Sequence, residues 1–425
     1  MQAITTARLG GALALSLIAI TGCVGDKTGY EGPFRAEVRR AIPRIEASSG
    51  LTFKATPKLE LRDRDQVREF LERAFQEQIT PLELAGVERA YKLFGMIPDS
   101  LELRSFLLDL LTEQVAGYYD PSTKVLYIVE GASPEMTGVT IDHELVHALQ
   151  DQYFPLDSTK ALKGDNDRQV AASAVIEGHA TYEQMSQALG GSDFSMRLPG
   201  GWDAVREMIR EGQAGMPKFA AAPVLLQETL LFPYLSGAEY ARQFKRLRPG
   251  QSPFEPLAQS TEQILHPEKL LGDTPDHPTR VTLGAPRGGS LIHEDNLGEF
   301  ETRLFLYEHS KDVGGSAAAA AGWDGDRYQV VQTSQGPGIA WLSVWDDAVE
   351  AAEFRDRMER MVERRYGAAP RSGGTGETRR WRARGRSLAL QMLSLSGRSV
   401  VVWEDVPSGA ATGLLNLAAV TLQEP

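Results

Sequence analysis

Residues 140–149, with the sequence Thr-Ile-Asp-His-Glu-Leu-Val-His-Ala-Leu, constrain this chain more than any other stretch. His143 and His147 are four residues apart, so in an α-helix both imidazole rings project from one face and can bind a single metal ion. Glu144 lies one step round the helix, where a carboxylate beside the metal can act as a general base without being a ligand. The flanking residues are apolar. The stretch therefore predicts a zinc-binding helix buried in the core of the fold.

The alternative is that this spacing arose by chance. The chain has only seven histidines in 425 residues, so a His-Glu-x-x-His sequence is expected by chance in roughly one in a hundred such chains. In that case the two histidines bond to backbone groups, and Glu144 lies on a solvated helix face. We favour the metal-binding interpretation.

A catalytic zinc site has three protein ligands and leaves its fourth position to water, so another ligand must come from elsewhere. Glu177 is the best candidate, because it lies in the apolar, alanine-rich helical stretch 170–185, where an acidic residue is otherwise poorly placed. His179 is the rival. Two positions turn a helix by about 200°, so Glu177 and His179 cannot both face one metal ion. We expect Glu177 to bind the metal and His179 to lie at the rim of the site.

These residues resemble the gluzincins, the thermolysin-like superfamily of zinc peptidases, whose third ligand is a glutamate on a later helix. Glu177-Gly178 matches that pattern, although thirty residues separate His147 from Glu177, more than in the shortest members of the family. The resemblance implies a mainly helical, zincin-like metallopeptidase domain that binds Zn²⁺ and hydrolyses peptide bonds. Peptides or proteins would be its substrates.

Two β-rich runs at residues 115–129 flank the turn sequence Asp120-Pro-Ser-Thr, which predicts a β-hairpin just before the metal helix. In gluzincins the strand before the metal helix is an edge strand, and an extended peptide pairs with it. The resemblance implies that residues 125–129 are this edge strand. The alternative is an interior hairpin without substrate contact.

Two further residues are candidates for stabilising the oxyanion of a tetrahedral intermediate. Tyr234 lies in an apolar helical run, and its hydroxyl could point at the site; the alternative is a buried tyrosine bonded to backbone. His266 ends a short helix that starts near Ser260, and its alternative role is to cap a turn. Residues 260–269, together with the hairpin and the metal helix, are similar to uncharacterised bacterial lipoproteins that carry the same gluzincin-like motif. This resemblance covers roughly residues 35–310.

Residues 1–22 have the pattern of a secretory signal, with one positive charge, an apolar run too short to be a structural transmembrane helix, and small residues before Cys23. The four residues that end at Cys23, Ile-Thr-Gly-Cys, resemble a bacterial lipobox, in which the cysteine is lipidated. An ordinary cleaved signal with an incidental cysteine is the alternative. We expect an exported protein that is anchored to the cell envelope through Cys23. The resemblance to bacterial lipoproteins also implies that Val24, in place of an aspartate after the cysteine, directs the anchor to the outer membrane of a two-membrane cell.

The composition of the chain limits its possible partners, the source of its stability and its number of domains. The formal charge of −12 and the absence of a basic block exclude nucleic acid as a partner. With a single cysteine, the chain has no internal disulfide, so its stability depends on its core. The length and the apolar content of 42 % suit two domains.

A low-complexity stretch at residues 311–322 predicts a linker. Beyond it, alternating strand-like runs and a helix at 346–366 predict a small α+β domain without histidine, so the whole chain belongs to the α+β class. The predicted organisation is a signal peptide at 1–22, a tether at 23–34, a zincin-like catalytic domain at 35–310, a linker at 311–322 and the small domain at 323–425.

Two function classes follow. The first is a membrane-anchored zinc metallopeptidase that acts in the cell envelope. The second is a lipoprotein that kept a peptidase fold but serves as a catalytically silent binding or assembly module. The complete motif of His143, Glu144 and His147 favours the first class, because a binding module gains nothing from a general base beside a metal ion.

Overall fold

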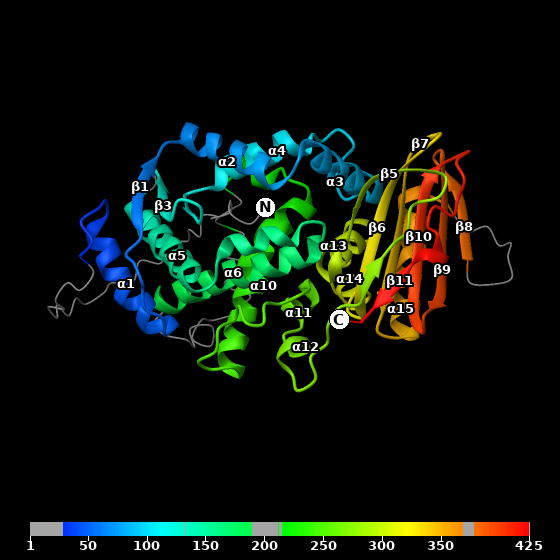
Figure 1. Cartoon of the computed structure of the whole chain (residues 1–425). Helices are drawn as coiled ribbons and strands as arrows, with labels where there is room; N and C mark the ends of the chain where they lie inside the picture. Colours follow the sequence, from blue (N-terminus) through cyan, green and yellow to red (C-terminus); the bar gives the residue numbers. More distant parts are fainter. Residues whose placement is uncertain (1–28, 132, 189–210, 212–214, 369–377, 425) are drawn as a thin grey trace.

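The computed structural model describes residues 29–131, 133–188, 211, 215–368 and 378–424. Figure 1 shows a mainly helical N-terminal part beside a C-terminal antiparallel sheet, which confirms the predicted α+β class. The predicted signal peptide and Cys23 lie outside the described residues. Within these ranges, no helix combines the length and apolar character that crossing a membrane requires.

The N-terminal part consists mainly of helices and contains a small three-stranded sheet. Its elements are α1 (Arg35–Ser49), β1 (Lys58–Arg62), α2 (Arg64–Gln78), α3 (Pro81–Phe94), α4 (Leu103–Gln114), β2 (Gly117–Asp120), β3 (Val125–Val129), α5 (Pro134–Tyr153), the 3₁₀ helix η1 (Leu156–Leu162), α6 (Asn166–Ala188), α9 (Pro217–Ala220), α10 (Val224–Leu247), α11 (Thr261–Leu265) and α12 (Glu268–Leu271).

The three-stranded sheet confirms the hairpin but corrects the prediction of an edge strand. β2 and β3 pair antiparallel, as the turn sequence predicts. However, β3 also pairs with β1, in parallel register from Lys58 with Val125 to Arg62 with Val129. β3 is therefore the central strand, in the order β1-β3-β2. Because both of its edges are hydrogen-bonded within the sheet, β3 cannot pair with a substrate peptide.

Helices α6 and α10 cross at a point where only glycine fits. A Cβ atom added to Gly178 of α6 would lie 2.0 Å from the backbone carbon of Gly237 on α10. In the same way, a Cβ atom on Gly237 would lie 2.1 Å from the carbonyl oxygen of Ala174. The two backbones are thus in direct contact next to Glu177. This contact fixes the position of the candidate third ligand relative to α10.

The C-terminal part contains a six-stranded antiparallel sheet with the order β5-β6-β7-β10-β9-β8. Its elements, with those that connect it to the rest, are β4 (Arg280–Thr282), β5 (Gly289–Asp295), α13 (Gly298–Ser310), α14 (Val313–Ala318), β6 (Trp323–Thr333), β7 (Gly336–Trp345), α15 (Ala348–Tyr366), β8 (Thr378–Ala383), β9 (Arg386–Leu395), β10 (Arg398–Pro407), the 3₁₀ helix η2 (Leu417–Ala419) and β11 (Thr421–Gln423).

Successive side chains of β7 are buried on opposite faces of this sheet, as the two-residue period of a strand requires. Trp341 and Trp345 point to α15, where their rings lie 5.5 and 4.4 Å from the ring of Phe354. Leu342 and Val344 point to the opposite face and belong to a second apolar cluster with residues of β4 and the C-terminal segment. The predicted arrangement of a helix on one side of an antiparallel sheet is confirmed.

The domain boundary at 311–322 stays a prediction, but three observations bear on how the two parts are joined. β5, which precedes this stretch, pairs with β6, which follows it. Residues Val313–Ala318 within it form the short helix α14. Phe94 of α3 packs edge-on against Trp341 of the sheet at 5.5 Å, and both belong to one continuous core cluster. The helical part and the sheet therefore share buried contacts.

Candidate metal centre

The metal helix α5 begins at a well-formed cap. The side chain of Ser133 accepts a hydrogen bond from the backbone N–H of Met136, and Pro134 occupies the first helical position. The apolar residues that flank the motif are all buried. α5 therefore lies in the core, as predicted, and carries His143 and His147 on one face.

His143, His147 and Glu177 form a buried group that could hold a metal ion. Each of the three is about 5 % exposed. Nε2 of His143 lies 3.1 Å from Nε2 of His147, and Oε2 of Glu177 lies 3.3 Å from the first and 3.2 Å from the second. The three candidate ligand atoms therefore form a nearly equilateral triangle.

This triangle has the dimensions of a zinc site. In a tetrahedral site with bonds of about 2.0–2.1 Å, two ligand atoms are about 3.3–3.4 Å apart. The observed separations of 3.1–3.3 Å correspond to three corners of such a tetrahedron. Two imidazoles and one carboxylate also match the donor set of catalytic zinc sites, which have three protein ligands rather than four. The residues present therefore fit the ion.

The charges within the group depend on one another. Burial alone would raise the pKa of Glu177, but His147 and His143 outweigh it and lower this pKa to about 2. Burial alone would lower the pKa of His147, but Glu177 outweighs it, with a contribution from Glu144, and raises this pKa to about 9. Burial lowers the pKa of His143. The charge of Glu177 is thus balanced by a proton on His147, and a metal cation would compete with that proton.

Two of the predicted site residues lie beside the three ligands. Glu144 is fully buried on α5, and its negative charge contributes to the raised pKa of His147. Tyr234 of α10 is 3 % exposed, and its ring centroid lies 6.0 Å from that of His143. The structure therefore brings together the residues that the sequence assigns to base catalysis, metal binding and, in the case of Tyr234, oxyanion stabilisation.

His179 does not lie at a rim, and this expectation is wrong. The residue is about 5 % exposed, and its ring packs edge-on against Phe254 at 5.6 Å. Its Nδ1 atom lies 3.0 Å from Nε2 of Gln150. The helical period correctly separates His179 from the face of Glu177, but the other side of α6 is buried too.

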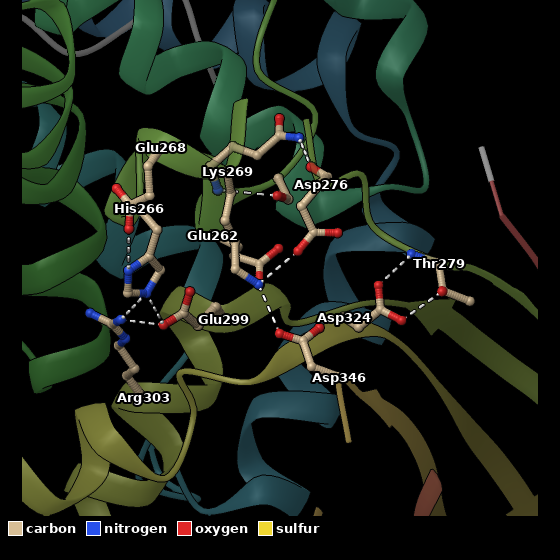
Figure 2. A network of polar contacts seen from close by, with 12 residues as sticks. Glu262, His266, Glu268, Lys269, Asp276, Thr279, Glu299, Arg303, Asp324 and Asp346 are labelled. Atoms are coloured by element: carbon tan, nitrogen blue, oxygen red, sulfur yellow. Dashed lines mark hydrogen bonds and ion pairs between the residues drawn. The ribbon is translucent and has the colours of Figure 1, made fainter. Parts of the chain in front are cut away.

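His266 lies in a different polar cluster, which Figure 2 shows. Its Nε2 atom is 3.1 Å from Oε1 of Glu299 and 3.0 Å from Nη2 of Arg303, both on α13. Glu299 is buried and also forms an ion pair with Arg303. These contacts join the end of α11 to α13. The structure does not bring His266 into the group of three ligands, and its role as an oxyanion donor stays a prediction.

A second group of carboxylates, made of Glu262, Asp276 and Asp346, has a lysine at its centre. Nζ of Lys269 lies 2.6 Å from Glu262 and 2.9 Å from each of the other two (Figure 2). Burial alone would lower the pKa of Lys269, but these carboxylates, above all Glu262, outweigh it and raise the pKa. The ammonium group of Lys269 already occupies the place between the carboxylates where a cation would bind, so we interpret the cluster as a structural connection between α12 and the end of β7.

Gln150 is a residue of the metal centre that sequence reasoning missed. It is buried on α5, and its Oε1 atom lies 2.8 Å from Nδ1 of His147. The spacing of three residues places Gln150 and His147 on one helix face and could have indicated this contact. The partners of Gln150 on α6 depend on how the two helices pack.

Comparisons with known proteins concern the sheet rather than the metal centre. A family model described as "Domain of unknown function (DUF8575)" matches residues 288–414, which include β5 to β10. Searches among curated proteins and among solved structures gave no match. The geometry of the group of three ligands is therefore the main source of functional information.

Proposed function

We propose that this protein is a gluzincin-like zinc metallopeptidase that hydrolyses peptide bonds in the cell envelope. The observation that supports this most is the triangle of ligand atoms from His143, His147 and Glu177, whose edges of 3.1–3.3 Å suit three corners of a zinc tetrahedron. The motif also supplies a carboxylate, Glu144, that is adjacent in sequence to a ligand. This combination belongs to hydrolysis, because a purely structural metal site has no use for a base.

In this proposal, His143, His147 and Glu177 would hold a zinc ion, which would supply Lewis-acid polarisation of the substrate carbonyl and lower the pKa of a water molecule. Glu144 is the carboxylate that would accept a proton from the attacking water and pass it to the leaving amine. Tyr234, whose ring faces His143, donates a hydrogen bond from its hydroxyl to the developing oxyanion. The low-dielectric surroundings of these buried groups strengthen each electrostatic contribution.

The second candidate function is a catalytically silent module for binding or assembly. Its support is the burial of the site: Glu144 is fully buried, and the three ligands are about 5 % exposed. At this exposure, little of each ligand's surface is open to a peptide. Short unstructured peptides are therefore better test substrates than folded proteins.

The test of the proposed function is metal-dependent cleavage of a library of unstructured peptides. The zinc-loaded protein should cleave members of the library, should lose this activity to a chelator, and should regain it when zinc is added back, with cleavage products identified by mass spectrometry. Cleavage that survives complete removal of metal would contradict the zinc mechanism. Stoichiometric zinc without any cleavage would favour the silent module.

We further propose that the protein is exported and anchored to the cell envelope through a lipidated Cys23, in the outer membrane of a two-membrane cell. The support is the sequence around Cys23, which resembles a lipobox and is followed by Val24. Each buried acyl methylene contributes roughly 0.8 kcal/mol, and two or more chains hold a protein stably on a membrane.

Cys23→Ser should therefore release the exported protein almost completely, because serine lacks the thiol that accepts the lipid. The measurement is cell fractionation with detergent partitioning of the wild type and the variant. A wild type in the aqueous phase, or a serine variant that stays in the membrane fraction, would overturn the proposed anchor.

A further inference from the structure

One side-chain amide connects the two helices that carry the candidate metal ligands. Oε1 of Gln150 on α5 lies 2.8 Å from Nδ1 of His147. Nε2 of Gln150 donates a hydrogen bond to the carbonyl oxygen of Ile176 at 2.9 Å and lies 3.0 Å from Nδ1 of His179. Gln150 is only 1 % exposed, so these groups replace water as its partners. The amide thus contacts the candidate ligand His147 directly. It also contacts Ile176, which precedes the candidate ligand Glu177 on α6.

The orientation of this amide follows from its partners. A backbone carbonyl can only accept hydrogen bonds, so the NH₂ group of Gln150 must face Ile176. The amide oxygen then faces His147, and Nδ1 of His147 must carry the hydrogen that it accepts. In the neutral ring, which is the form of histidine that binds a metal ion, Nε2 has the free lone pair. This is the atom that faces His143 and Glu177.

His179 holds the amide from its other side. Its Nδ1 atom can accept the second N–H of Gln150, which places its own ring hydrogen on Nε2. That Nε2 atom lies 3.6 Å from a carboxylate oxygen of Glu183, which is fully buried and paired with Lys245 of α10. The network therefore extends from the candidate ligand His147 through α6 to α10. It also provides the buried ring of His179 with polar partners.

We infer that Gln150 is a positioning residue of the metal centre: it presents Nε2 of His147 to the metal and fixes α5 relative to the part of α6 that carries Glu177. This inference rests on the proposed function, because it takes the group of three ligands as a metal site. Partners that orient a ligating histidine typically contribute 10–100-fold to metal affinity. Replacing Gln150 would also leave the hydrogen on Nδ1 of His147 buried without an acceptor.

The test compares two glutamines that both connect α5 with α6. Gln184 of α6 donates to the carbonyl oxygen of Val139 on α5, and none of the hydrogen bonds described for the three ligands involves it. Gln150→Leu should weaken zinc binding by about 10–100-fold in a competition titration with a chromophoric chelator. Gln184→Leu also loses a hydrogen bond between the helices, and it should leave zinc affinity unchanged. Thermal unfolding of both metal-free variants shows whether their losses of stability are comparable.

A second measurement does not require any variant to fold. Nitrogen-15 NMR of the histidine rings in the zinc-loaded wild type should show a hydrogen on Nδ1 of His147 and the metal on Nε2. The inference alone is overturned if wild type binds zinc and Gln150→Leu binds it equally well, if both variants weaken it equally, or if Nδ1 of His147 carries the metal. A wild type that binds no zinc would instead overturn the proposed function, and with it this inference.

Discussion

Replacing Glu144 by glutamine should lower the rate of peptide hydrolysis by roughly 10²–10⁴-fold while zinc stays bound, because the change removes the general base and no ligand. Glutamine has nearly the shape of glutamate, so the buried position beside His143 is preserved. The measurement is kcat and KM for a peptide selected from the library, together with the zinc content of the same preparation. The reduction should appear in kcat rather than in KM.

Asp142→Asn is the matched control for this variant. Asp142 is the residue before His143, and its carboxylate accepts a hydrogen bond from Arg44 of α1 at 2.9 Å. The Asp142→Asn variant therefore loses a charge on the same helix, and the substituted residue is not one of the three ligands. Asp142→Asn should keep wild-type kcat. Equal activity of wild type and Glu144→Gln would contradict the role of Glu144, and comparable losses in both variants would show that the effect is not specific to the base.

Gly178→Ala should destabilise the fold and weaken zinc binding together. The added Cβ atom would lie 2.0 Å from a backbone carbon of Gly237, and neither helix backbone can yield without moving the other. Overpacking of a core typically costs about 1–3 kcal/mol, and a contact between two backbones should cost at least the upper value. Because Gly178 follows Glu177 directly, the shift of α6 moves a ligand. We expect a lower free energy of unfolding in denaturant titrations and a higher Kd for zinc.

Gly138→Ala is the control for this clash. Gly138 lies inside α5, and a Cβ atom added there meets nothing within 4 Å. Alanine is favoured over glycine in a helix by roughly 0.5–1 kcal/mol, so this variant should be slightly more stable than wild type and should bind zinc normally. If Gly178→Ala matched Gly138→Ala in stability, the close contact of α6 with α10 would not exist as described.

The candidate ligands were predictable because they depend on local periodicity. A spacing of four residues places His143 and His147 on one helix face in any fold, and the apolar surroundings of Glu177 mark it as a carboxylate with a specific partner. Neither argument requires knowledge of the tertiary structure. The hairpin of β2 and β3 was predictable for the same reason, because a turn sequence lies between two β-rich runs.

The predictions that the structure corrects concern contacts between segments that are distant in the sequence. β3 is a central strand because β1, more than sixty residues earlier, pairs with its other edge. The apolar run at residues 125–129 is consistent with a buried strand, but it does not identify β1 as the partner. In the same way, the contact of Gln150 with Ile176 and the burial of His179 depend on how α5, α6 and α10 pack. The resemblance to gluzincins predicted an edge strand at residues 125–129, and only the parallel pairing with β1 corrects it.

The central claim is that His143, His147 and Glu177 together hold one metal ion. The most direct measurement is the zinc content per chain of the purified protein, determined by mass spectrometry of the metal, for wild type, Glu177→Ala and the double variant His143→Ala with His147→Ala. The wild type should hold about one zinc per chain, as three ligands of a catalytic site require, and both variants should lose it. Stoichiometric zinc in the double variant, or a wild type without zinc after incubation with the ion, would contradict the claim.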